Sequence, residues 1–132
     1  MKTIFKVGDS KTFERIVCEE DTAKFESGAV HNVYATFAIA RDAEWCSRLF
    51  VLDFKEENEE GIGTFVTVKH ISPAKIGDAV LFESVIVLFE RNKLNCIFSA
   101  KVKGKLIAEG ETGQKILLKS EFEKLFDKLK ND

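Results

Sequence analysis

The sequence of 132 residues is poor in cysteine and histidine, with three of the first and two of the second. Cys18, Cys46 and Cys96 stand far apart and form no CxxC pair, which argues against a structural zinc site. We therefore expect no metal and no other cofactor. A small, odd number of cysteines is typical of reduced thiols, so we expect a cytoplasmic protein.

Neither sign of charge is in excess, because 20 Lys and Arg oppose 22 Asp and Glu, which gives a net charge of −2. This balance leaves no basic surplus to attract nucleic acid or an anionic membrane. The longest apolar stretches, such as 85–89, have the length of a strand and not of a membrane span. The start is charged within six residues, and no apolar run of signal-peptide length follows. We expect no nucleic-acid partner and no membrane association.

Hydrophobic residues make up 45% of the chain and charged residues 32%, a mixture typical of a globular protein and not of a disordered one. The length suits one domain, so we expect a single domain over 1–132. Twelve Phe against one Trp and one Tyr indicate an interior with few polar aromatic groups.

Apolar periodicity predicts strands where the repeat is two and helices where it is three and four. The expected elements, in chain order, are a strand over 11–19, an irregular stretch over 20–33 with turns at Gly28 and Asn32, a helix over 35–52, an acidic, solvated loop over 53–60, a strand over 64–71, a loop over 72–78, strands over 79–90, 94–103 and 106–118 joined by turns at 91–93 and 103–105, and a C-terminal helix from Ser120. Gly110 and Gly113 are expected to bend or bulge the last strand. This order is α+β, and the alanine-rich helix suggests a sheet that curls around it.

The C-terminal helix has Ser120 and Glu123 at the spacing of a capping box. Its apolar stripe follows helical periodicity and consists of Phe122, Leu125, Phe126 and Leu129. We expect this stripe to pack on the sheet of its own chain; a helix that binds a partner is the alternative.

Three polar residues in apolar surroundings are candidates for chemistry: Thr36, Glu44 and His70. His70 shares a predicted strand face with Thr64, Val66 and Val68. Each candidate also has an ordinary interpretation, namely a hydroxyl that caps the first helical turn, a solvent-facing glutamate and a hydrogen-bonded core histidine. We expect His31 to lie in a loop and Cys46 to be a small core residue, both without a chemical role.

The spacing of these residues resembles that of a known family. Thr36 is followed by Glu44 after eight residues, and Gly63 precedes His70 by seven. This pattern is similar to that of hot-dog-fold thioesterases and, within them, to the fluoroacetyl-CoA thioesterase family. The segment from His70 to Ala74, followed by Gly77-Asp78, also resembles a turn common in hot-dog proteins. The resemblance covers roughly residues 8–118.

The resemblance implies a hot-dog fold, a homodimer with CoA sites between the subunits, and hydrolysis of an acyl-CoA thioester to an acid and CoA. It also implies that Thr36, Glu44 and His70 form the reactive set, with Gly63 and Thr64 at the substrate, and that Glu44 is either nucleophile or general base. A glycine lets the main chain approach a ligand closely. On an unbroken helix Thr36 and Glu44 lie about 12 Å apart. Either the helix begins after Thr36, or the two residues flank the acyl group from different sides.

One stretch of the last strand departs from the family pattern. Where that family has a Gly-Thr-His-Glu-Arg run, this chain has Gly110-Glu111-Thr112-Gly113-Gln114. Fluoroacetyl specificity is therefore not carried over, and the acyl group stays open. Two other functions also stay open on the sequence: a non-catalytic acyl-CoA or lipid-binding module, and a hot-dog enoyl-CoA hydratase-like lyase.

Overall fold

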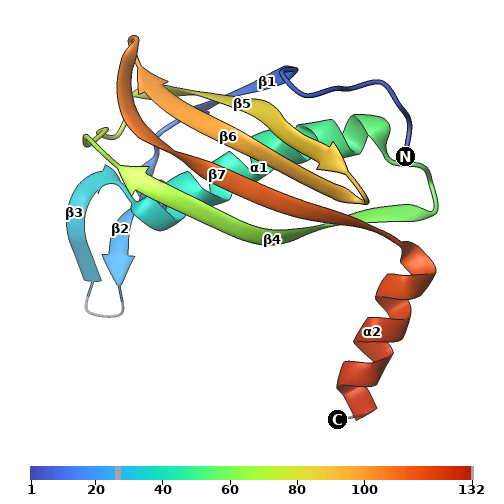
Figure 1. The fold of residues 1–132 in the computed structure, drawn as a ribbon. Helices are drawn as coiled ribbons and strands as arrows, with labels where there is room; N and C mark the ends of the chain where they lie inside the picture. The colour runs from blue at the N-terminus through green and yellow to red at the C-terminus, as the bar shows by residue number, and fades with distance from the viewer. Residues whose placement is uncertain (26–27, 132) are drawn as a thin grey trace.

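A five-stranded antiparallel sheet curls around one long helix (Figure 1) in the computed structural model, which describes residues 1–25 and 28–131. The elements in chain order are β1 (Ser10–Ile16), the short 3-10 helix η1 (Glu19–Asp21), β2 (Thr22–Phe25), β3 (Gly28–Tyr34), α1 (Thr36–Phe54), β4 (Glu59–His70), β5 (Ala79–Glu90), β6 (Lys93–Val102), β7 (Lys105–Leu118) and α2 (Lys119–Asn131). The strand order of the large sheet is β1-β5-β6-β7-β4, which leaves β1 and β4 at its two edges. The predicted α+β arrangement of a sheet around a central helix is confirmed.

Helix α1 packs on the sheet through two apolar clusters, one at each half of the helix. Near its start, Ala38, Ile39 and Ala43 contact residues such as Phe82 and Phe98 on the sheet. Near its end, a second cluster surrounds Phe50, Val51 and Phe54. The small side chains of the alanines in the first half let the helix lie close to the strands. The two clusters together bury a continuous apolar face of α1, which explains the periodicity from which the helix was predicted.

Three hydroxyl groups lie between α1 and the middle of the sheet. Ser47 Oγ on α1 lies 2.6 Å from Ser84 Oγ on β5 and 2.6 Å from Thr112 Oγ1 on β7, and all three side chains are buried. Buried polar groups that satisfy one another add directional contacts to an otherwise apolar core. This hydroxyl triangle therefore favours one position of α1 along the sheet over positions shifted by a residue.

The stretch 20–33 was predicted to be irregular, and this prediction is wrong. Strands β2 and β3 form a two-stranded antiparallel sheet of their own, and Gly28 and Asn32 lie in β3 instead of in turns. Among the described residues, β3 also forms an isolated backbone bridge outside this pair, between Val33 and Lys75. The sequence gives little signal for these strands, because β2 has only four residues and β3, Gly-Ala-Val-His-Asn-Val-Tyr, does not alternate between apolar and polar residues. His31 is exposed on β3 and not in a loop.

Strand β4 is longer than predicted and contains an irregularity at Thr64. It begins at Glu59, so the acidic loop is shorter than 53–60, and Glu59 and Glu60 are ion-paired with the N-terminal amine and with Arg48. In the pairing with β7, Gly63 lies opposite Gln114 and Phe65 lies opposite Gly113, so Thr64 is an extra residue. This bulge therefore lies in β4, opposite Gly113. Strand β7 has an extra residue of its own in its pairing with β6, at Ile107 and not at Gly110 or Gly113 as predicted.

The bulge changes which side chains of β4 face α1. After it, Val66, Val68 and His70 face the helix; before it, Gly63 does. Thr64 is turned the other way: a Cβ built on Gly113 would overlap the Phe65 ring and lie 2.8 Å from Thr64 Oγ1. The prediction that Thr64 shares a face with His70 is therefore wrong, because the alternation of two is interrupted between them.

Helix α2 does not pack on the sheet of its own chain, which corrects the expectation for its apolar stripe. No residue of α2 is buried, and in Figure 1 the helix leaves the end of β7 and extends past β4 away from the sheet. The helix begins at Lys119, which places Ser120 inside the first turn and not at the cap. Helical periodicity shows that one face is apolar, but it does not say which molecule covers that face. Across the described residues, no helix combines the length and the apolar character needed to cross a membrane.

The start of α1 is fixed by a buried ionic cluster around Asp42. Its carboxylate accepts a hydrogen bond from the Tyr34 hydroxyl, from Arg15 at 3.0 and 3.2 Å, and from Arg41 at 3.0 Å. Arg41 also donates to Asp21 at 2.7 Å, and the Asp21 carbonyl accepts the Ala35 N–H at 2.8 Å. Burial, followed by the hydrogen bond to Asp42, raises the pKa of Tyr34 well above its usual range. The cluster thus ties the residue before α1 to the helix itself.

The pH dependence of the free energy of unfolding tests whether Asp21 stabilises this cluster. Burial alone would raise the pKa of Asp21, but hydrogen bonds from Arg41 and Cys18 outweigh burial and lower that pKa. Asp21→Asn should reduce the free energy of unfolding by about 1–3 kcal/mol at pH 7, because a charge-assisted hydrogen bond is lost. The stability that Asp21 contributes is complete above its unfolded pKa of about 3.9 and is lost as the pH falls through the lower folded value.

Urea unfolding of the unmodified chain and of Asp21→Asn between neutral and acidic pH measures this difference. We expect the difference to be constant down to about pH 5 and to shrink below about pH 4. Glu57→Gln, at an exposed carboxylate in the loop before β4, controls for the removal of one negative charge. If the two chains differ in free energy of unfolding by the same amount at acidic and neutral pH, the Asp21 carboxylate does not stabilise the cluster as proposed.

Candidate active site

Thr36 and His70 meet where α1 begins and β4 ends. Thr36 Oγ1 lies 3.0 Å from His70 Nδ1. The helix is preceded by Ala35 at the N-cap position, and no side chain caps its first turn. Thr36 is therefore the first helical residue and not the cap, so its hydroxyl contacts His70 instead of the helix backbone.

The second ring nitrogen of His70 has no partner. His70 Nε2 is buried, and no described residue forms a hydrogen bond with it. Buried polar atoms in proteins are nearly always paired, so an unpaired ring nitrogen beside a bound hydroxyl indicates a position for a proton or a ligand. This geometry distinguishes His70 from the fully hydrogen-bonded core histidine that was its ordinary interpretation.

Glu44 and Gly63 meet two turns further along α1. A Cβ built on Gly63 would overlap Glu44 Oε1 and would lie 3.0 Å from Glu44 Cδ. The carboxylate thus occupies the space that any other residue at position 63 would fill. Among the described residues, no hydrogen bond or ion pair holds this carboxylate. A half-buried carboxylate without a partner is free to bind water or a substrate.

Two further side chains lie near Gly61, two residues before Gly63, and were not predicted as site residues. Arg48, one turn after Glu44, donates to the Gly61 carbonyl at 3.0 Å and to Glu60 at 3.3 Å. Gln114 is 2% exposed, lies opposite Gly63 in the sheet, and has an amide nitrogen, Nε2, without a hydrogen-bond partner. A Cβ on Gly61 would lie 3.6 Å from Gln114 Oε1 and 3.5 Å from Arg48 Nη1. The sequence marked Gln114 only as a departure from a family pattern.

The two contact pairs are separate within one chain. Helix α1 is continuous from Thr36 to Phe54, so the alternative in which it begins after Thr36 is wrong. Thr36 and Glu44 are about 12 Å apart along the helix axis. Gly63 and His70 are separated by seven residues of strand, or roughly 20 Å with the bulge allowed for. The two pairs are therefore two separate candidate half-sites along the contact between α1 and β4, which continues past Glu44 to Val51 and Gly61.

The remaining candidates are placed away from these half-sites. Thr64 faces the opposite side of the sheet, toward Gly113. Cys46 is fully buried, as predicted for a core residue, and burial raises the pKa of its thiol to about 12. Within residues 1–25 and 28–131, no group of three or more His, Cys, Asp or Glu side chains is placed to hold a metal ion.

Comparison with known proteins identifies the family. A family model described as fluoroacetyl-CoA-specific thioesterase (FlK) matches residues 17–120. A Thermus thermophilus hypothetical protein, described as a thioesterase superfamily member, is 38% identical, with a TM-score of 0.91 over 96% of this chain and 93% of its own. No curated protein matches the sequence significantly.

Two more distant structures share the fold. The fluoroacetyl-CoA thioesterase FlK is 20% identical, with a TM-score of 0.85 over 94% of this chain and 96% of its own. A hot-dog-like protein from Thermanaerovibrio acidaminovorans is 19% identical, with a TM-score of 0.86 over 94% and 92%. The predicted hot-dog fold is confirmed, and the family match favours hydrolysis over a binding module or a hydratase. The chain belongs to the fluoroacetyl-CoA-specific thioesterase family, and it is an acyl-CoA thioesterase.

Proposed function

We propose that the thioester is hydrolysed at a site shared by two chains, in which Thr36 and His70 of one chain face Glu44 and Gly63 of the other. The observation that carries this proposal is the 3.0 Å contact between Thr36 Oγ1 and His70 Nδ1, beside a buried Nε2 that has no partner. A hydroxyl held by an imidazole whose other nitrogen is unoccupied is suited to proton transfer at a bound ligand.

Thioester hydrolysis needs an attacking oxygen, a proton acceptor and a proton donor for the departing sulfur. The oxygen bonds to the carbonyl carbon, the carbon–sulfur bond breaks, and the CoA sulfur leaves with a proton. In this proposal His70 moves that proton, and Thr36, whose Oγ1 lies 3.0 Å from His70 Nδ1, orients its ring. The first N–H groups of α1, which no side chain caps, supply donors for the negative charge on the carbonyl oxygen.

Glu44 supplies the carboxylate at the carbonyl carbon. It either attacks that carbon itself, to form an anhydride that water then hydrolyses, or takes a proton from the attacking water. Both routes need a carboxylate that is not already neutralised, and Glu44 has no partner among the described residues. Gly63 lets the thioester approach this carboxylate because no side chain lies between them.

The separation of the half-sites supports a homodimer. Strand β4 pairs with β7 on one side only, and an unpaired edge strand of 12 residues must be covered. Antiparallel pairing of two β4 strands about their midpoint near Phe65 would set Gly63 of one chain opposite Thr67 of the other. Gly63 would then lie about 10 Å along the strand from the partner's His70, half the separation within one chain.

Gln114 is proposed to contact the acyl part of the substrate. Its buried amide nitrogen has no partner, and it lies opposite Gly63, against which Glu44 packs. A neutral amide at this position differs in charge from the Arg of the fluoroacetyl-CoA family pattern. We therefore propose an acyl-CoA substrate in this protein without assigning fluoroacetyl-CoA as that substrate.

A cytoplasmic location is also proposed. All three cysteines are free, including the exposed Cys18, which is the state expected in a reducing compartment.

His70→Ala and Glu44→Gln should each lower turnover by roughly 10²–10⁴-fold, because each removes a group that transfers a proton or attacks the carbonyl carbon. Release of free thiol from short, branched, aromatic and long acyl-CoAs measures turnover, and thermal unfolding measures stability. Glu57→Gln is the matched control for the carboxylate. Normal turnover per folded molecule, combined with a lower melting temperature, would assign His70 and Glu44 to the structure and not to the reaction.

Mixing the two variants tests whether the site is shared. A dimer of one His70→Ala chain and one Glu44→Gln chain has one site with both defects and one site with neither. If subunits exchange freely, half of the dimers are mixed, so activity should return to about a quarter of that of the unmodified protein. If each chain held a complete site, every site would keep one defect, and mixing would restore no activity.

Gln114→Met should change stability and activity in opposite directions. The substitution removes a buried donor without a partner, so the free energy of unfolding should rise by about 1 kcal/mol, because an unpaired buried donor carries a desolvation cost. The value of kcat/KM should fall roughly tenfold, because a donor to the substrate is lost. Urea unfolding and thiol release measure the two effects. Unchanged kcat/KM in a stabilised variant would remove Gln114 from the site.

A further inference from the structure

Helix α2 presents an apolar face that no part of the described chain covers. This α2 stripe consists of Phe122, Leu125, Phe126 and Leu129, which are 40%, 55%, 51% and 71% exposed. The rings of Phe122 and Phe126 stack with their centroids 6.5 Å apart. Four large apolar side chains on one exposed helix face form an interaction surface and not a scatter of single residues.

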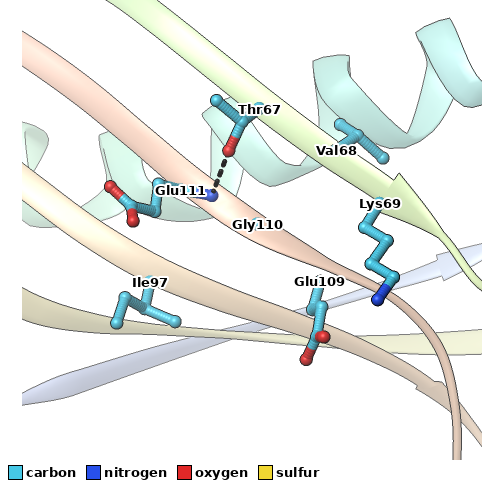
Figure 2. A pocket seen from close by; sticks show the side chains of 7 residues that line it. All are labelled: Thr67, Val68, Lys69, Ile97, Glu109, Gly110 and Glu111. Carbon is cyan, nitrogen blue, oxygen red and sulfur yellow. Dashed lines mark hydrogen bonds between the residues drawn. The ribbon is translucent and has the colours of Figure 1, made fainter.

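A hollow of about 370 Å³ lies on the face of the sheet that is turned away from α1. This Gly110 hollow is lined by Thr67, Val68, Lys69, Ile97, Glu109, Gly110 and Glu111 (Figure 2). Ile97, which lines the hollow, is 49% exposed, and Glu111 N–H donates to Thr67 Oγ1 at 3.0 Å. The hollow combines an apolar floor with two carboxylates and one amine at its rim.

The α2 stripe cannot reach the Gly110 hollow of its own chain. Helix α2 follows Leu118, which pairs with Glu59 at the start of β4, whereas the hollow lies at Thr67 to Lys69 near its end. Eight to ten residues of strand span about 26–33 Å. The 13 residues of α2 span about 20 Å. Figure 1 shows that α2 extends past β4 and away from the sheet, so it does not turn toward the hollow.

We propose that the α2 stripe of one chain docks into the Gly110 hollow of a second copy. This inference rests on the dimer through β4 proposed above. Antiparallel pairing of two β4 strands places the start of one strand beside the end of the other. Helix α2 departs next to the start of β4, because Leu118 pairs with Glu59. At that level the partner's hollow spans β4, β7 and β6, since Val68 pairs with Gly110 and Glu111 pairs with Ile97.

The free face of the sheet supports this placement. At the end of β4, the side toward the helix is already occupied by the start of α1 and by the contact between Thr36 and His70. The opposite side carries only the charged rim and the hollow. A helix that extends past the β4 edge must lie on one of these two faces of the partner, and only the second is open.

The charges around the two surfaces are complementary. At 100° per residue, the α2 stripe is bordered by three lysines and two glutamates, namely Lys119, Lys128, Lys130, Glu121 and Glu123. The rim of the hollow has the opposite balance, with Glu109 and Glu111 against Lys69. Docking the stripe would therefore place lysines near carboxylates while its aromatic rings cover the exposed side chain of Ile97.

Cysteine cross-linking tests the docking in the full-length chain. In a Cys18→Ser background, chains with Leu125→Cys are mixed with chains that carry Ile97→Cys and are oxidised under mild conditions. We expect a disulfide-linked pair of the two different chains. Leu81→Cys, an equally exposed residue on β5 at the far side of the sheet, replaces Ile97→Cys as the matched control and should give no such pair.

Sedimentation separates failure of the docking from failure of the dimer. Phe126→Glu should weaken the dimer at least about tenfold, because it places a charge in a buried apolar contact. A dimer that Phe126→Glu leaves unchanged and that forms no Leu125–Ile97 cross-link would overturn the docking alone. Cross-links between two Leu125→Cys chains in place of the mixed pair would assign the stripe to another α2. A monomeric unmodified chain would overturn the dimer and the docking together.

Discussion

The close approach of α1 to β4 is the constraint on which the site depends. Gly61 and Gly63 have no side chains toward the helix, and this space is filled by Val51 at Gly61 and by the Glu44 carboxylate at Gly63. At Gly63, any Cβ would overlap Glu44 Oε1, so a larger residue would displace the carboxylate itself. The same pair of elements meets again at Thr36 and His70. The continuous helix between Thr36 and Glu44 thus keeps the two candidate half-sites of one chain apart.

The packing behind this contact keeps α1 from shifting along the sheet. The two halves of the helix pack in two apolar clusters, but apolar contacts alone tolerate small displacements. The Ser47 hydroxyl, bonded to Ser84 and Thr112, adds a directional contact at the middle. The Asp42 cluster adds another at the start. A shift of one residue would leave several buried polar groups without partners, each at a cost of about 1–3 kcal/mol.

The sequence predicted the elements whose burial is regular and missed those whose geometry is decided by a neighbour. Strands 79–90, 94–103 and 106–118 alternate because one face of each lies on α1, and they were predicted nearly to the residue. Thr64 could not be placed, since the bulge that turns it away is visible only in the pairing of β4 with β7. Gln114 was noted as a departure, but the missing partner of its amide is a property of the folded chain.

The spacing of the candidate residues predicted the function only because it resembles the spacing in a known family. The eight residues from Thr36 to Glu44 and the seven from Gly63 to His70 are compatible with many proteins, and periodicity alone gives each residue an ordinary role. The structure adds that Thr36 contacts His70 and that Glu44 contacts Gly63, while the pairs stay roughly 12 Å apart along α1. A single thioester carbonyl cannot contact both pairs of one chain. In the dimer proposed above, the β4 edge that pairs with a second copy would also bring Thr36 and His70 of one chain to Glu44 and Gly63 of the other, so that covering the edge and assembling the proposed reactive set would be one event.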